Sequence, residues 1–236
     1  MKPLIGITLD FVNKGSFSPR PHYAIRDSYF KAVEAAGGTP IAIPYIKNSI
    51  DDYLSLVKGL IIPGGDFRLD SNWYVKDDVP GFEVTPRLDF DVEIITKALK
   101  KNIPLLGICA GMQILGGMLG CKLTSNINKY VGTRICHSGG VSAEEYAHDI
   151  HIEKNTLLKK ITGLEEMPVN SRHQEGIVEL SDKVTLAGKS DDGVIEAIEV
   201  KGKDFALGIQ WHPEFFIKDG EPNFKLFQAL VKAATK

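Results

Sequence analysis

The sequence has few cysteines and no excess of one charge, and each shortage excludes a class of protein. Cys109, Cys121 and Cys136 form an odd and sparse set, which argues against a disulfide framework and favours a reducing compartment. The net charge is −2 with both signs interspersed, so the chain lacks the positive field that binds nucleic acid or an anionic membrane. We therefore expect a small molecule as the ligand.

Long hydrophobic runs are also missing. The opening stretch MKPLIGITLD has too few consecutive apolar residues for a secretion signal, and no later run approaches the roughly 20 residues that span a bilayer. The chain has 236 residues, of which 43% are hydrophobic, and this is enough to bury a sizeable core. We expect a cytoplasmic protein without membrane contact.

Strand-like apolar runs alternate with helical patterns through the first half of the chain. Nearly continuous apolar runs of this kind are typical of a parallel sheet that helices cover on both faces. The expected strands are 3–10, 39–46, 58–66 and the run that begins at Ile103, and helices are expected after Pro21, across 49–57 and after Pro86. In the helix after Pro86, the helical spacing of Leu88, Val92, Ile95 and Leu99 predicts the buried face.

The second half is mostly β in pattern. Strands are expected at 148–154, 183–190, 193–201 and within 204–216, with Asp191-Asp192-Gly193 as a hairpin turn and a closing helix after Pro222. These strands predict antiparallel additions to the sheet. Since no linker or repeat separates the halves, we expect one α/β domain over residues 1–236.

The stretch IPLLGICAGMQ places Cys109 where an apolar strand ends and a helix begins. In an open parallel sheet, a tight turn at this edge raises one side chain above the strands, and Gly107 and Gly111 would allow the unusual angles and close approach it needs. The helix N-terminus favours the thiolate, so Cys109 is predicted to be a nucleophile. A free cysteine is more often a small buried hydrophobe, but this context favours catalysis.

A cysteine nucleophile needs a base and an orienting group, and the stretch GIQWHPEFF offers both. His212 ends an expected buried strand, and Glu214 can turn back to accept the N–H of its imidazole. Cys109, His212 and Glu214 are therefore the candidate triad. The alternative is a structural histidine beside an exposed glutamate.

Other histidines are weaker candidates. His137 directly follows Cys136 in a glycine-rich loop, but adjacent residues seldom aim their side chains at each other, which weakens this rival dyad. His148 and His151 are spaced like a metal pair, yet a separation of three on a strand puts them on opposite faces. We expect them on a solvated strand and predict no metal site.

Several stretches together resemble a known family. GICAGMQ, GIQWHPE and the PGGD turn resemble the class I glutamine amidotransferase domains over essentially the whole chain. VNSRHQEGI and SDDGVIEAIEV are similar to the branch of peptidase C26 type that contains γ-glutamyl-γ-aminobutyrate hydrolase. The resemblance implies a flavodoxin-like three-layer α/β sandwich, mostly parallel with antiparallel additions in the second half. It also implies hydrolysis of a γ-glutamyl amide through a thioester by the triad.

The resemblance assigns further site residues. The oxyanion donors would be the backbone N–H groups of Gly65 and Ala110, and Gln113 would hold the glutamate end of the substrate. Gln113 lies one helical turn beyond Cys109 and can face the same pocket, the alternative being a solvent-facing position. His173 falls in a segment that lies near the active site in relatives, and is expected to be a pocket residue.

The sequence departs from the branch at three places. Ala110 stands where a basic residue is usual, FRLDSNWYVKDD follows PGGD in place of a proline and tyrosine pattern, and NSRHQE lacks a doubled histidine. These departures leave the identity of the leaving amine open. We expect the loop 67–84 to line the amine side of the pocket.

Three functions stay open. The favoured one is a stand-alone γ-glutamyl hydrolase, because no synthetase is appended; the others are a glutaminase subunit that delivers ammonia to a separate synthetase, and a binding protein that has lost activity. The chemistry requires no metal or organic cofactor, and the sequence has no Walker loop or dinucleotide fingerprint. The expected partners are a small γ-glutamyl substrate, a second copy in a homodimer and, for the glutaminase, a synthetase.

Overall fold

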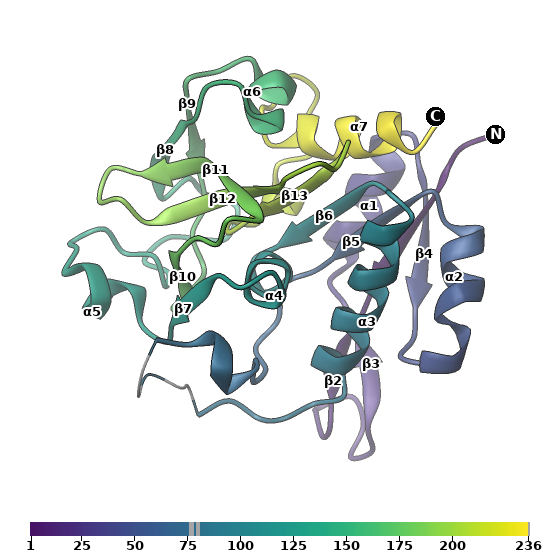
Figure 1. Cartoon of the computed structure of the whole chain (residues 1–236). Helices are drawn as coiled ribbons and strands as arrows, with labels where there is room; N and C mark the ends of the chain where they lie inside the picture. Colours follow the sequence, from purple (N-terminus) through teal and green to yellow (C-terminus); the bar gives the residue numbers. More distant parts are fainter. Residues whose placement is uncertain (76–77, 79–80, 236) are drawn as a thin grey trace.

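A nine-stranded mixed sheet with strand order β4-β1-β5-β6-β13-β12-β11-β8-β9 forms the centre of the molecule (Figure 1). The structure is a computed structural model, and it describes residues 1–75, 78 and 81–235. The strands of this sheet are β1 Leu4–Thr8, β4 Thr39–Ile43, β5 Gly59–Ile62, β6 Leu105–Ile108, β8 His148–Ile152, β9 Glu166–Val169, β11 Val184–Ser190, β12 Ile195–Val200 and β13 Ala206–Ile209. The α-helices are α1 Asp27–Ala35, α2 Ile50–Leu56, α3 Arg87–Lys100, α4 Ala110–Met118, α5 Ile127–Val131, α6 Leu157–Thr162 and α7 Phe224–Ala233.

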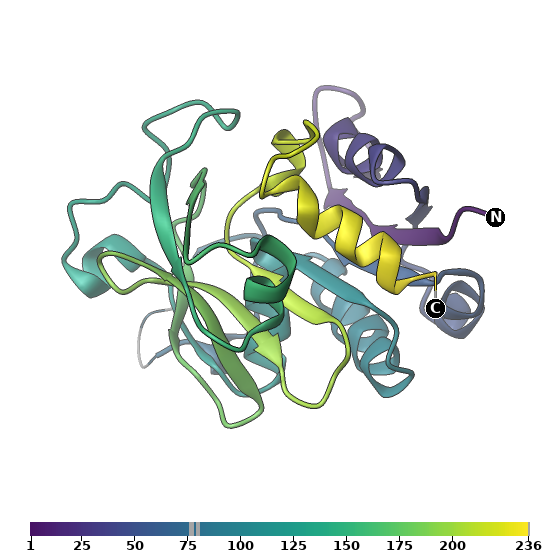
Figure 2. The ribbon, with the colours of Figure 1, turned by 90° about the horizontal axis from the view of Figure 1, so that it is seen from above.

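The five strands β4, β1, β5, β6 and β13 are parallel, and helices cover both of their faces. Seen from above, α1 and α7 lie on one side of this sheet and α3 on the other (Figure 2). Alternate residues of one strand enter different cores: Ile61 packs with α1 and α7, whereas Leu60 and Ile62 pack with α2, α3 and α4. Burial on both faces explains the continuous apolar runs of these strands.

The second half adds antiparallel strands to the same sheet, as the sequence predicts. β11 and β12 form a hairpin whose turn contains Gly193 at φ 83°, and the Gly193 N–H donates to the Ser190 carbonyl at 2.9 Å. The Ser190 N–H donates to the Val194 carbonyl at 3.0 Å, so Asp191, Asp192 and Gly193 form a three-residue loop whose left-handed last position favours glycine, and the Asp-Asp-Gly signal is confirmed. The arrangement is the flavodoxin-like α/β fold that the resemblance implies.

The carboxyl ends of the five parallel strands lie at one edge of the sheet. The register pairs Ile62 of β5 with Gly107 of β6, and Ile108 of β6 with Ile209 of β13. The chain segments that leave β5, β6 and β13 therefore emerge side by side. This edge holds the predicted site.

Two local predictions need correction. The segment after Pro21 first forms β3, His22–Ala24, which pairs with β2, Asp10–Val12, so α1 begins only at Asp27. In α3, Leu88 and Val92 are only half-buried, and the buried face instead includes the charged Arg87 and Asp91. Apolar spacing missed this face because the two charges neutralise each other inside the protein.

A short two-stranded sheet and several 3₁₀ helices lie outside the central sheet. β7, Lys122–Thr124, pairs with β10, Gly176–Glu179, and neither strand was predicted. The 3₁₀ helices are η1 Lys47–Ser49, η2 Ser71–Trp73 and η3 Pro213–Phe215.

Among the residues that the structure describes, no helix has the length and apolarity to cross a membrane.

Substitution of Gly111 by alanine tests how closely α4 must approach the sheet. A Cβ at Gly111 would lie 2.1 Å from the carbonyl oxygen of Ile62, which is backbone and cannot rotate away. We expect Gly111→Ala to lower the free energy of unfolding by about 2–4 kcal/mol, measured by urea denaturation. Gly188→Ala is the control, because its Cβ would meet its nearest neighbour at an ordinary 3.4 Å. Equal stability of the two variants would contradict the prediction.

Candidate active site

Cys109 lies at the junction of β6 and α4 in a backbone conformation that is rare for a residue with a side chain. Its φ and ψ are 52° and −109°, and it is one of three non-glycine residues with positive φ in the described chain. Its N–H donates to the Ile209 carbonyl at 2.8 Å, and its carbonyl accepts the N–H of Met112 and Gln113. Cys109 thus ends the strand ladder and begins the helix, the arrangement of a nucleophile elbow.

The flanking glycines permit this turn by close packing. A Cβ at Gly107 would lie 2.7 Å from the carbonyl oxygen of Gly111, and a Cβ at Gly111 would collide with Ile62. Neither glycine has a positive φ, so the unusual angles belong to Cys109 itself. The sequence correctly predicts close approach at these glycines but assigns the strain to the wrong residues.

His212 follows β13 at the same edge, and its imidazole contacts Glu214. The distance from His212 Nδ1 to Glu214 Oε1 is 2.8 Å, and both side chains are buried. Because Nδ1–H donates to the carboxylate, Nε2 is left for Cys109. Cys109 and His212 both pack against Gly64: a Cβ there would lie 2.7 Å from His212 Cε1 and 3.3 Å from Cys109 Cβ.

The charge state of His212 follows from these contacts. Burial disfavours the imidazolium, but the carboxylate of Glu214 and the sulfur of Cys109 outweigh it and raise the pKa of His212 to about 10. A protonated His212 beside Cys109 favours the thiolate. His212 therefore carries a proton at neutral pH, and this proton is available for a leaving group.

Asn170 fixes the backbone of His212 from both sides, and the sequence did not single it out. Its Oδ1 accepts the His212 N–H at 2.8 Å, and its Nδ2 donates to the His212 carbonyl at 3.0 Å. Asn170 is fully buried, so these bonds replace water. The fold thus sets the position of the imidazole through an amide in the VNSRHQE stretch.

The Arg87 side chain donates hydrogen bonds to the PGGD turn, and the sequence did not single this residue out. The fully buried guanidinium donates to the carbonyls of Pro63 and Gly64, and through Nε to Asp91 at 3.0 Å. It also lies 4.3 Å from the centre of the Phe67 ring. These contacts fix the loop that carries Gly65, one of the predicted oxyanion donors.

Two cavities meet at Cys109. The first, of about 320 Å³, contains Ala110, Gln113 and Glu175 on the side of α4. The second, of about 280 Å³, contains His212, Arg26 and Phe215. Gly65, Asp66, Cys109 and Arg172 line both cavities. A substrate bound across them would place its reacting carbon between the sulfur and the imidazole.

The structure brings the other predicted residues to this site with one difference in orientation. Gly65, Ala110, Gln113 and His173 all line the first cavity. The Gln113 amide nitrogen donates to the Glu175 carbonyl at 3.1 Å, so the protein holds this side chain in place. His173 lies at the cavity wall, but its Nδ1 contacts the Glu175 carbonyl at 2.9 Å and its Nε2 faces Glu196 in the interior.

Glu175 is a further cavity residue that the sequence did not reveal. Tyr74 donates to its Oε2 at 2.8 Å, while burial and the charges of Asp66 and Asp78 raise its pKa to about 7. Its place beside His173 in the RHQEGI stretch was the available signal. Phe67 and Phe82 of the loop 67–84 line this same cavity, and residues 76–77 and 79–80 of the loop lie outside the described residues.

The rival histidine pairs do not form. Cys136 is exposed whereas His137 is fully buried, so the two side chains point apart. His148 and His151 do lie on opposite faces of β8, but the solvated strand is wrong for one of them: the His148 side chain is 6% exposed and that of His151 is 46% exposed. All three cysteines are free thiols.

The strand order and the cysteine elbow define a class of protein, the α/β proteins that carry a nucleophile at the carboxyl edge of a parallel sheet. PurLQS of Thermotoga maritima has this fold, with a TM-score of 0.67 and 20% identity over 100% of both chains. A glutamine amidotransferase-like protein of Rickettsia prowazekii is 32% identical over 99% of this chain and 98% of its own length. The γ-glutamyl-γ-aminobutyrate hydrolase PuuD of Escherichia coli is 28% identical over 98% of this chain and 93% of its own.

The profile of the peptidase C26 family matches residues 3–214. The chain belongs to the peptidase C26 family. The matched range contains the elbow cysteine, the histidine and Glu214. The resemblance drawn from the sequence motifs is confirmed.

Replacing Glu214 by glutamine tests the electrostatics of the pair. The carboxylate stabilises the imidazolium, so its neutralisation in Glu214→Gln should lower the pKa of His212 well below 10, and neutral imidazole should appear at lower pH. A ¹⁵N NMR titration of the ring follows this directly. Glu166→Gln is the control, because Glu166 faces the exposed His151 at 3.7 Å. An unchanged His212 titration in Glu214→Gln would contradict the assignment.

Proposed function

We propose that the protein is a cysteine-dependent hydrolase that cleaves a γ-glutamyl amide through a γ-glutamyl thioester, releasing glutamate and an amine. The observation that carries the proposal is the cavity that Cys109 and His212 share, with Glu214 2.8 Å from the far nitrogen of the imidazole. Membership of the peptidase C26 family supports a hydrolase.

In the first half of the reaction, Cys109 acts as nucleophile. Its thiolate attacks the γ-carbonyl carbon, and the backbone N–H groups of Gly65 and Ala110 stabilise the negative oxygen that forms. The C–N bond then breaks as His212 donates its proton to the departing amine. Glu214 keeps the imidazole in the orientation that this transfer needs.

In the second half, water resolves the thioester. His212, now neutral, removes a proton from water, and the hydroxide attacks the thioester carbon. The C–S bond breaks, glutamate leaves and the thiolate returns. The high pKa of His212 suits its role as proton donor in the first half, and the loss of the nearby thiolate charge in the thioester lowers that pKa for its role as base.

The first cavity suits the glutamate end of the substrate. An α-ammonium and an α-carboxylate need an acidic and a basic partner, and Glu175 and Arg172 line the cavity together with Asp66. Gln113 adds an amide whose nitrogen is already bonded, which leaves its oxygen side for the substrate. This distribution supports the assignment of Gln113 to the glutamate end.

The second cavity suits the leaving amine. It lies on the His212 side, where the proton is delivered, and Arg26 and Arg172 line it. Arg172 also lines the first cavity, so Arg26 is the guanidinium specific to this side, and it favours an amine that carries its own anionic group. The substrate class is therefore a γ-glutamyl derivative of an anionic amine.

A glutaminase subunit is the second candidate, because relatives carry the name glutamine amidotransferase. Such a subunit would release ammonia from glutamine and depend on a synthetase partner. Arg26 in the second cavity favours the hydrolase, since ammonia offers it no anionic group. A cytoplasmic location and a homodimer stay predictions.

Release of free glutamate from a panel of substrates tests the activity. The purified protein should act on γ-glutamyl amides of carboxylate-bearing amines, and Cys109→Ser should reduce kcat at least about 10³-fold because the oxygen nucleophile lacks activation. Glu214→Gln should reduce kcat less, because His212 keeps its position at the Asn170 clamp. Glutamate release from glutamine alone, dependent on an added synthetase, would favour the glutaminase. Full activity of Cys109→Ser would overturn both candidate functions, the hydrolase and the glutaminase.

A specificity experiment tests the second cavity. Arg26→Gln should raise KM for amides of carboxylate-bearing amines about threefold to tenfold, since the side chain is exposed and its contact is screened. KM for amides of neutral amines should stay the same. Arg20→Gln is the control, because Arg20 is exposed and outside the cavity lining. An equal change with both substrate types would contradict the anionic preference.

A further inference from the structure

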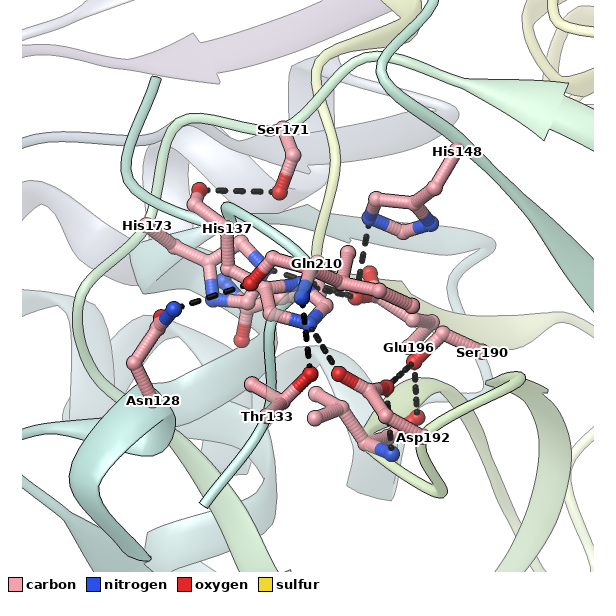
Figure 3. A network of polar contacts seen from close by, with 12 residues as sticks. Asn128, Thr133, His137, His148, Ser171, His173, Ser190, Asp192, Glu196 and Gln210 are labelled. Atoms are coloured by element: carbon pink, nitrogen blue, oxygen red, sulfur yellow. Dashed lines mark hydrogen bonds and ion pairs between the residues drawn. The ribbon is translucent and has the colours of Figure 1, made fainter. Parts of the chain in front are cut away.

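Three histidines surround one buried glutamate behind the active-site wall, and the proposed reaction uses none of their polar atoms. Figure 3 shows the rings of His137, His148 and His173 around the carboxylate of Glu196. From Glu196 Oε1 the distances are 3.3 Å to His137 Nδ1, 3.7 Å to His148 Nε2 and 3.4 Å to His173 Nε2. Each of these four side chains is at least nine-tenths buried.

The four side chains come from separate parts of the chain. His148 begins β8 and Glu196 lies on β12, and β11 separates these strands in the sheet. His137 lies in the segment between α5 and β8, and His173 lies between β9 and β10. Such a convergence of ionisable groups in the interior needs a compensating interaction.

The outer nitrogen of each ring already has an oxygen partner. His137 Nε2 lies 2.9 Å from Asp192 Oδ2, His148 Nδ1 lies 3.1 Å from the Asp149 carbonyl, and His173 Nδ1 lies 2.9 Å from the Glu175 carbonyl. These oxygens only accept hydrogen bonds, so each outer nitrogen carries the proton. In a neutral imidazole, the inner nitrogen, which faces Glu196, then has a lone pair and no proton.

The inner atoms consequently have no partners within the protein. His137 Nδ1, His148 Nε2, His173 Nε2 and both oxygens of Glu196 are buried without a hydrogen bond in the described chain. Three lone pairs directed at an ionised carboxylate repel it. Protonation of all three rings would relieve the repulsion but would gather three positive charges around one buried carboxylate, with only Asp192 to offset the excess.

The spacing fits a metal ion better than hydrogen bonds. Hydrogen bonds between these atom types fall at 2.7–3.2 Å, shorter than all three distances. Nitrogen and oxygen ligands lie about 2.0–2.2 Å from zinc, so the edges of a tetrahedral site are about 3.3–3.6 Å. The ligand atoms of His137, His148 and Glu196 all lie within 4.8 Å of one another.

We propose that His137, His148 and Glu196 bind a divalent transition-metal ion, zinc being the ion that this donor set suits best, and that His173, whose Nε2 lies 3.4 Å from the same carboxylate, moves in as fourth ligand. Imidazole nitrogens that donate their other N–H to a carboxylate or carbonyl are the usual form of protein zinc ligands. A charge of +2 balances Glu196 and Asp192. With four protein ligands the site is structural.

The ion would hold the inner wall of the catalytic cavity. His173 belongs to the segment 170–175, which also supplies the Asn170 clamp on His212 and Glu175 at the cavity. The His173 N–H donates to the His137 carbonyl at 2.8 Å, so two ligands are already tied together. A metal would fix this segment to β8 and β12. The sulfur chemistry itself still requires no metal.

Metal content and thermal stability test the site. After chelator treatment, the full chain should bind about one zinc ion in equilibrium dialysis with zinc alone, and saturating zinc should raise Tm by about 10 °C. Cobalt(II) in its place should give the visible absorption of a tetrahedral site. Cys109→Ser should bind zinc equally, which separates this site from the thiol.

His148→Gln and His151→Gln form a matched pair on β8. His148→Gln should weaken zinc binding at least about 100-fold, whereas His151→Gln, on the exposed face, should not change it. If His148→Gln does not fold, the cobalt spectrum and zinc stoichiometry of the His151→Gln and Cys109→Ser variants decide. Failure of the unaltered chain to bind zinc, or equal binding by His148→Gln, would overturn the proposal and leave a cluster of ion pairs around Glu196.

Discussion

Cys109 holds a positive φ that costs a residue with a side chain about 1–3 kcal/mol, and the packing around it prevents relaxation. Its N–H is fixed to β13 by the bond to Ile209, and its carbonyl begins α4. Gly107 and Gly111 let the helix lie so close to β5 and β6 that any Cβ would collide with backbone. The Cys109 side chain therefore projects above the carboxyl edge of the sheet.

The remaining site is built by fixing other groups to the same edge. β13 delivers His212, and Asn170 bonds both of its backbone groups, while Arg87 bonds the carbonyls that precede Gly65. These bonds are buried, so water does not compete for them. The positions of imidazole and oxyanion loop thus depend on charged and amide side chains within the core, and Glu214 supplies the charge that keeps His212 protonated.

The sequence predicted the local parts of this arrangement and missed the nonlocal ones. The elbow at Cys109 and the pair of His212 with Glu214 depend on neighbours within a few positions, so spacing reveals them. The burial of Arg87 depends on Asp91 one turn away, which apolar periodicity ignores. The cluster at Glu196 joins four distant segments, and only the alternation of β8 hinted at it: His148 shares a face with Ile150 and Ile152, which a strand pattern would bury.

Covalent trapping at the elbow cysteine tests the central claim most directly. The protein is mixed with a γ-glutamyl amide, quenched in acid within its turnover time and digested for mass spectrometry. The account predicts one glutamyl group in thioester linkage on the peptide that contains Cys109, which disappears as glutamate accumulates. Glutamate release with an unmodified Cys109, or a glutamyl group on Cys121 or Cys136 instead, would contradict it.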